Sequence, residues 1–194
     1  MRRDVCCLLS IAALFVLGAT SSAAARDYDD DDIDPTRLYG GLWLGFGGDA
    51  EVDGDDMFTG DLETTVGGQL GVDRIVSRYF SLGAEARFGA IKWKQFDGSK
   101  LIDLDFKPRL RLPLRSLPLE FYAAVPVGLT IPRLRDINGR PDDKIGWNVG
   151  AGGGVNFFIT DDFGLNAEPM WLMHDFGDYR LKQFSLFLNV ILAL

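Results

Sequence analysis

The sequence predicts an all-β fold, an eight-stranded antiparallel up-and-down transmembrane β-barrel. Three observations lead to this prediction. Apolar and polar residues alternate with a period of two through most of the chain beyond residue 36, which is the pattern of strands with two different faces. The alternating stretches are each about ten residues or longer, as a tilted strand needs to cross a bilayer. The connections between them are long and short in turn, as they are in outer-membrane barrels.

The first 25 residues are predicted to be a signal peptide. Two arginines at positions 2 and 3 precede an apolar run over residues 8–19, and small residues lead up to a cleavage site near Ala25. The apolar run is shorter than the ~20 residues that a membrane-spanning helix needs; an uncleaved anchor is the alternative. Residues 26–36 contain the acidic run Asp29–Asp32 and are predicted to be a disordered tail. The barrel domain is then expected over residues 37–194.

Composition excludes several classes of protein. With 47% hydrophobic residues among 194, the chain is too apolar for an intrinsically disordered protein. The formal net charge of -8 argues against nucleic-acid binding, which usually requires a basic surface. Cys6 and Cys7 both lie in the expected signal peptide, so no disulfide or thiolate metal site is expected in the mature chain.

The eight expected strands follow the alternation with different clarity. The first two contain more glycine, whereas the third and fourth place leucine, alanine and phenylalanine on one face. The other face carries glutamate and arginine among serine and glycine in the third strand, and aspartate, lysine and arginine in the fourth. The last four continue the rule to the end of the chain. The expected ranges are Leu38–Gly48, Leu62–Arg74, Leu82–Ala90, Leu104–Leu114, Leu119–Ile131, Ile145–Ile159, Phe163–Met173 and Phe184–Leu194.

Connections of two kinds link these strands. Long, polar loops are expected at one end of the barrel and tight turns at the other, and in an outer-membrane barrel the long loops face the outside of the cell. The expected loops cover residues 49–61, 93–101, 131–144 and 174–182, and the expected turns cover 73–79, 115–118 and 160–162.

The apolar face is expected to point outward against lipid. It is continuous, whereas the other face mixes charge with glycine, and eight strands enclose an interior just wide enough for side chains. Aromatic residues on the apolar face lie toward both expected interfaces. The alternative is a soluble, lipocalin-like barrel whose apolar face points inward. The aromatic residues are Phe46, Trp147, Trp171 and Phe184 near the loops and Phe80, Phe121, Phe157 and Phe163 near the turns.

A network of charged side chains is expected to fill the interior, with glycines 146, 150, 152 and 154 leaving room for arginines. Pairing of acidic with basic side chains suffices to explain why both occur on this face, because an unpaired buried charge is energetically costly. Four prolines, at positions 108, 113, 126 and 169, fall within expected strands and require bulges or a place near the rim. The interior network comprises Glu85, Arg87, Asp105, Lys107, Arg109, Arg111, Glu120 and Glu168.

In architecture, the region from Arg37 to Leu194 resembles the small outer-membrane barrels of the OmpA/OmpX type, although the chain ends on leucine where those barrels usually end on an aromatic residue. The resemblance implies an outer-membrane location in a Gram-negative bacterium, a structural or surface-interaction role, and no open pore. It also implies contact with outer-membrane lipid and lipopolysaccharide, and with the β-barrel assembly machinery during biogenesis. Such families use internal salt bridges as a plug or gate, which is a second interpretation of the charged interior. No cofactor and no periplasmic peptidoglycan-binding domain is expected.

Two further hypotheses concern chemistry. Residues 49–61 resemble the opening of a calcium loop, but position twelve is Gly60 where a bidentate glutamate is required, so a solvated acidic loop is favoured. Enzymes that modify lipid A exist on this scaffold and need a nucleophile with a nearby base. His174 is the only histidine, and the sequence His174-Asp175-Phe176 lacks the His-x-Ser pairing of the deacylases. The chain is therefore expected to be no enzyme, with His174 a polar residue at the rim.

Overall fold

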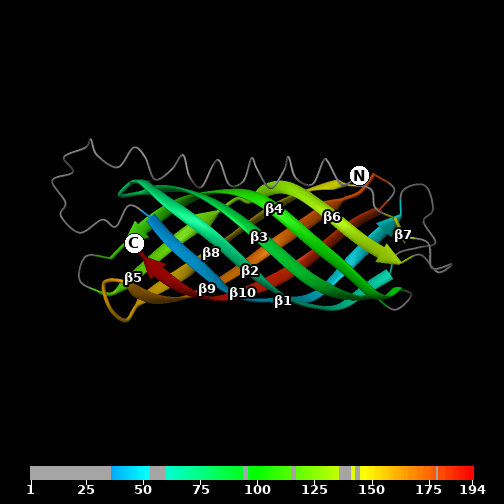
Figure 1. Cartoon of the computed structure of the whole chain (residues 1–194), viewed down its shortest axis with the longest axis horizontal. Coiled ribbons are helices and arrows are strands. Elements are labelled where there is room, and N and C mark those ends of the chain that lie inside the picture. The colour runs from blue at the N-terminus through cyan, green and yellow to red at the C-terminus, as the bar shows by residue number, and fades with distance from the viewer. Residues whose placement is uncertain are drawn as a thin grey trace.

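The computed structural model describes residues 36–52, 60–93, 96–114, 117–135, 141–142, 145–177 and 179–194. The predicted signal peptide and almost all of the acidic tail lie outside these residues. The described chain forms a closed antiparallel β-barrel whose strands are tilted to its long axis (Figure 1). The predicted fold class is confirmed. The described residues contain no helix that is long and apolar enough to cross a membrane.

Eight strands make up the wall of the barrel, and one of them is interrupted. β5 and β6 are two parts of the same wall strand, because both pair with β4 on one side and with β8 on the other. The short β7 pairs only with the end of β6. The strands are β1 (Thr36–Val52), β2 (Gly60–Ser77), β3 (Phe80–Trp93), β4 (Phe96–Pro113), β5 (Leu119–Ala124), β6 (Val127–Arg135), β7 (Pro141–Asp142), β8 (Gly146–Phe158), β9 (Phe163–Asp175) and β10 (Tyr179–Ala193).

The barrel closes by pairing of the first and last strands. β1 pairs with β10 along its length, with Leu42 opposite Leu188, and β2, β3 and β4 follow in chain order from β1. Leu194 N donates to Thr36 O at the closure. The C-terminus and β5 lie at one end of the barrel, and β7 lies at the other (Figure 1). We call the end with β7 the outer end, because it carries the longer connections.

Two of the predicted loops are wrong, because the strands continue through most of them. The third and fourth strands run to Trp93 and from Phe96, so the loop predicted over 93–101 is a short connection. β9 and β10 likewise extend to Asp175 and from Tyr179. The charged residues in these segments suggested loops, but they alternate with apolar residues and continue the strands.

The prolines coincide with irregularities in the hydrogen-bonding pattern. Pro126 separates β5 from β6, the two parts of the strand predicted over 119–131, and this break is the kind of irregularity that the proline was expected to require. Pro108 lies next to the break on β4. Both carbonyls still accept hydrogen bonds, Pro108 O from Val125 N at 3.3 Å and Pro126 O from Gly150 N at 2.9 Å. Pro169 lies at a second irregularity, where β8–β9 pairing is interrupted between Gly152↔Met170 and Val155↔Ala167 while the register stays the same on both sides. Pro113 is the last residue of β4, which gives it the place near the rim that was expected.

The apolar face of the wall is outside. Leu42, Leu70 and Leu110 are 56%, 66% and 65% exposed, whereas charged residues on the alternate positions are buried. In a soluble barrel the apolar face points inward, so the soluble, lipocalin-like alternative is excluded. Six of the eight predicted girdle aromatics are exposed on this face, and two are half-buried, Phe80 and Phe163.

Glycines on the inner face make room mainly for rings and apolar side chains. A Cβ atom at Gly89 would lie 2.7 Å from the Trp43 ring, and one at Gly154 would collide with the Tyr122 hydroxyl. A Cβ atom at Gly150 would lie 2.6 Å from the side chain of Leu172. A Cβ atom at Gly146 would meet Asp175 and Phe176, and one at Gly152 would meet Pro169 and Met170. The expectation that glycines 146, 150, 152 and 154 leave room for arginines is therefore wrong.

Candidate functional site

All eight predicted network residues point into the barrel and are buried. They come from four strands. β3 carries Glu85 and Arg87, and β5 and β9 carry Glu120 and Glu168. β4 contributes the rest at every second position, which places them on one face of the strand. The β4 residues are Asp105, Lys107, Arg109 and Arg111.

The centre of the network is Lys107. Its Nζ atom donates to Glu85 Oε2 and to Glu168 Oε2, both at 2.8 Å. The Tyr39 hydroxyl also donates to Glu85 Oε2, at 2.9 Å. Lys107 is fully buried, so this one ammonium group balances two carboxylates and links β4 to its neighbour β3 and, across the lumen, to β9.

Toward the outer end, a second cluster surrounds Asp103. Arg87 Nη2 lies 2.6 Å from Asp105 Oδ2 and 3.4 Å from Asp103 Oδ2. Asp103 also accepts from Thr130 Oγ1 at 2.7 Å, and His174 Nε2 lies 3.1 Å from Asp103 Oδ2. Arg87, Asp103 and His174 are completely shielded from solvent. This cluster joins β3, β4, β6 and β9.

At the opposite end, Glu120 is the centre of a third cluster. It accepts from Arg37 Nη1 at 2.9 Å, from Asn156 Nδ2 at 2.7 Å and from Arg111 Nη2. Arg37 lies on β1 and Glu120 on β5, so this ion pair joins opposite sides of the barrel. Nearby, Arg109 Nη1 pairs with Asp73 Oδ2 at 3.1 Å.

Aromatic rings separate and support these charges. The Arg109 guanidinium lies 4.6 Å from the Tyr39 ring centroid and 5.1 Å from that of Tyr122. Arg87 lies 5.7 Å from both the Trp43 and Phe187 rings, which stack on each other at 6.0 Å. Cation–π contact of this kind favours buried cations.

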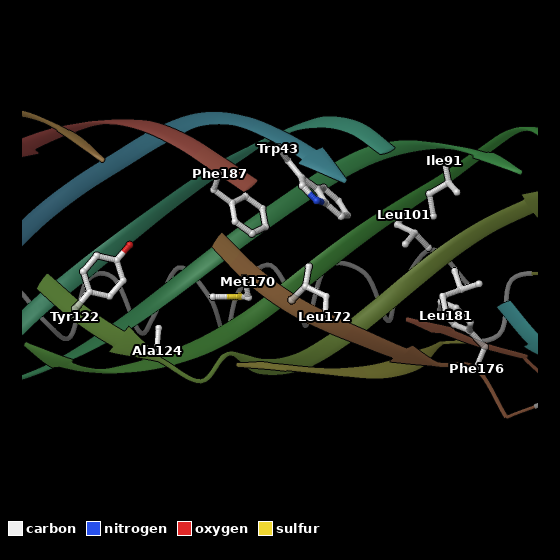
Figure 2. Packing of buried hydrophobic residues seen from close by; sticks show 10 residues of the cluster. All are labelled: Trp43, Ile91, Leu101, Tyr122, Ala124, Met170, Leu172, Phe176, Leu181 and Phe187. Atoms are coloured by element: carbon white, nitrogen blue, oxygen red, sulfur yellow. The ribbon is translucent and has the colours of Figure 1, made fainter. Parts of the chain in front are cut away.

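Apolar and aromatic side chains share the lumen with the charged clusters. Trp43, Phe187 and Met170 lie around the middle of the group, and Tyr122 lies toward the opposite side from Phe176 (Figure 2). Near Phe176 the lumen is filled by a set of buried residues that we call the mouth cluster. The mouth cluster comprises Ile91, Leu101, Phe176 and Leu181.

A family model described as the outer membrane protein beta-barrel domain matches residues 11–191. The chain belongs to this family. It is thus an outer-membrane β-barrel, and the apolar outer surface described above is its lipid-facing surface.

Solved structures of similar fold include Neisserial surface protein A (NspA), with a TM-score of 0.58, 12% identity, and coverage of 81% of this chain and 97% of that one. Ail, the attachment invasion locus protein of Yersinia pestis, gives a TM-score of 0.53, 10% identity, and coverage of 82% and 99%. At these identities the likeness concerns the fold alone. No curated protein matches the sequence.

In this outer-membrane β-barrel, a small cavity of about 10 Å³ lies near the Glu120 end, with room for one water molecule at most. Polar and aromatic side chains surround it. The lining residues include Arg37, Tyr39, Asp73, Arg109, Tyr122 and Asn166.

Several members of the buried network were not predicted from sequence. Asp73 lies where the expected strand Leu62–Arg74 and the expected turn 73–79 overlap; β2 continues past it to Ser77 and turns its side chain inward. Asp103 belongs to the inward set of β4 by its odd position, which was the available signal. Leu101 and Leu181 fell in predicted loops, although they too have the inward parity of their strands.

His174 was expected at the rim, and this expectation is wrong. Its side chain is buried inside the barrel against Asp103, with its ring stacked on Phe176 at 6.4 Å. The position follows from the alternation in β9, where Leu172 and Met170 also point inward.

The calcium-loop hypothesis concerns residues that the structure describes only in part. Asp49 and Glu51, at the first and third ligand positions, lie in β1 and pair with β10. Glu51 Oε1 accepts from Lys182 Nζ at 2.6 Å, so this carboxylate already has a cationic partner. Residues 53–59 lie outside the described residues.

Proposed function

We propose that this protein is a closed outer-membrane barrel with a structural or surface-interaction role, and that it carries no open pore. The observation that carries the proposal is the filled lumen. Lys107, Arg87, Trp43 and Phe187 project into it and are fully buried. An eight-stranded barrel has room only for side chains, so these groups leave no continuous aqueous path in the described part of the chain.

The clusters support closure at three levels of the barrel. The mouth cluster fills the outer end, the Lys107 bridge crosses the centre, and the pair between Arg37 and Glu120 crosses the other end. A charged group leaving these contacts would enter a low-dielectric interior without compensation, which costs several kcal/mol. Thermal opening of the lumen is therefore expected to be rare.

The role at the cell surface is supported by the architecture. The connection between β1 and β2 at the outer end spans residues 53–59 and contains several acidic residues. NspA is named a surface protein and Ail an attachment invasion protein, and we extend a surface role to this chain. Its proposed partners are outer-membrane lipid, lipopolysaccharide and, during biogenesis, the barrel assembly machinery.

Solute efflux tests the closed lumen. Purified barrel is placed in lipid vesicles loaded with a small dye, and folding is checked by the difference in gel migration before and after boiling. We expect efflux no faster than from protein-free vesicles. A Trp43→Ala, Phe187→Ala double variant removes two rings from the lumen and serves as the leaky control. Rapid efflux through the wild-type barrel contradicts the proposal.

Cysteine labelling tests the exposure of the outer end. Arg180→Cys lies at the outer end and Asp161→Cys at the opposite end, and both residues are exposed. A membrane-impermeant maleimide is expected to label position 180 in intact cells and position 161 only after permeabilisation. The reverse pattern places the long connections in the periplasm and contradicts a surface role.

A further inference from the structure

Two basic residues lie directly opposite each other on the lipid-facing surface near the outer end. Lys100 of β4 and Arg133 of β6 are register partners, and both side chains are exposed. Ile102 and Ile131, each two residues closer to the middle of the barrel, form the next pair on the same face. Side chains paired in this way start about 4.5–5.5 Å apart at their Cβ atoms.

Like charges in direct cross-strand opposition are destabilising, and here nothing nearby offsets them within the described residues. Neither Lys100 nor Arg133 has a hydrogen bond or ion pair with another described side chain. Arg180 and Lys182 on β10, one exposed and one half-buried, differ from this pair. Lys182 pairs with Glu51 at 2.6 Å, and Arg180 pairs with Asp175 at 3.0 Å. The pair of Lys100 and Arg133 thus presents an excess of positive charge on the barrel wall.

The height of the pair places it at the level of lipid headgroups. Leu129 is the register partner of Trp147, an exposed aromatic residue of the kind that marks the membrane interface. Arg133 is four residues beyond Leu129 toward the outer end of β6, about 13 Å along the strand at 3.3 Å per residue. On the other side of the isoleucine pair, Leu104 faces Leu129 and Phe106 faces Val127. The basic pair therefore borders the apolar band on its water side.

We propose that Lys100 and Arg133 bind a phosphate group of a phosphorylated glycolipid in the outer leaflet, while Ile102 and Ile131 contact the adjoining acyl chain. This inference rests on the surface orientation in the proposed function. A phosphate between the two cations converts their repulsion into two attractions. The arginine fork offers paired donors to phosphate oxygens, and lysine adds a compact point charge.

Unfolding of the barrel in vesicles of defined composition tests the proposal. Wild-type protein is compared with a Lys100→Gln, Arg133→Gln double variant in phosphatidylcholine vesicles that contain lipid A, dephosphorylated lipid A or phosphatidylglycerol. A Lys182→Gln, Arg180→Gln double variant is the matched control, because it removes two basic residues at the same end that already have acidic partners. The readout is the urea midpoint of unfolding.

We expect lipid A to raise the wild-type midpoint more than dephosphorylated lipid A or phosphatidylglycerol does. The Lys100, Arg133 double variant is expected to lose most of this increase, and the control variant to keep it. In pure phosphatidylcholine the Lys100, Arg133 double variant should be at least as stable as wild type, because the repulsion is gone. That measurement also shows that the variant folds.

Three outcomes overturn the inference. The first is an equal lipid A response in the wild type and the Lys100, Arg133 variant. The second is an equal response to phosphatidylglycerol, which indicates a general anionic surface effect. The third is equal stabilisation by inorganic phosphate in phosphatidylcholine vesicles, which makes free phosphate the ligand. If the phosphate-binding inference fails in these vesicles, the closed lumen tested by dye efflux is not affected. A failure of the proposed surface role is identified separately, by a reversed pattern of cysteine labelling.

Discussion

Lys107 Nζ on β4 lies 2.8 Å from Glu168 Oε2 on β9, and the two strands are separated by β8 and the β5–β6 strand. The pair is therefore a contact across the lumen, made by side chains alone. Backbone hydrogen bonds join each strand to its neighbours and leave the cross-section of the barrel free to deform. Ion pairs that cross the lumen, such as this one and that of Arg37 with Glu120, restrict this deformation.

Replacing Lys107 with methionine is expected to destabilise the barrel by about 3–5 kcal/mol, because it leaves Glu85 and Glu168 buried without their shared cation. Urea unfolding in vesicles measures this loss. Lys182→Gln removes a lysine from the exposed outer rim and is expected to have a small effect. Similar losses for the two variants would mean that the central bridge contributes no more than a surface pair.

The lipid-facing surface gives a second prediction. Leu188 lies on the outer face of β10, well inside both ends of the strand, and is 42% exposed. Leu188→Arg is expected to cost about 2–4 kcal/mol, the cost of placing arginine near the bilayer midplane. Leu194→Arg, at the end of the chain, is expected to cost about 0–1 kcal/mol. The reverse ranking contradicts the assignment of the membrane band.

The mouth cluster gives a third prediction. Leu181 is buried inside the outer end, so Leu181→Ala leaves a cavity and is expected to cost about 2–5 kcal/mol. Leu188→Ala on the lipid-facing surface should cost less, because lipid chains fill the space that the truncated side chain leaves. Equal losses in urea unfolding contradict the assignment of Leu181 to a packed interior.

Strand parity made much of this architecture predictable. Because successive side chains alternate between faces, the sequence alone assigned Glu85, Lys107 and Glu168 to one interior. The ends of strands were less predictable. Charged and apolar residues mix near residues 93–101 and 174–182. The strands there carry charged residues such as Lys100 and Arg180 on the outer face and leucines on the inner face, the reverse of the membrane-spanning pattern, so they resemble loops in sequence.

Contacts across the lumen were not predictable from alternation. Parity says that Asp103 and His174 both point inward, but their heights depend on the tilt and stagger of the strands, which the barrel as a whole sets. The chain holds a single histidine, and its place just beyond the expected strand Phe163–Met173 suggested a rim. Only the assembled barrel brings His174 within 3.1 Å of Asp103.

Substitutions at His174 can distinguish a structural role in this contact from the enzyme hypothesis. His174→Ala removes a buried partner of Asp103, and loss of a buried hydrogen bond to a charged group is expected to destabilise the barrel by about 1–3 kcal/mol. His174→Gln, which retains a side-chain donor, should recover part of this loss. In cells that carry each variant, the composition of labelled outer-membrane lipid is expected to match that of cells with the wild-type protein. A changed lipid profile in a variant that still folds would falsify the structural assignment and make His174 a candidate catalytic residue.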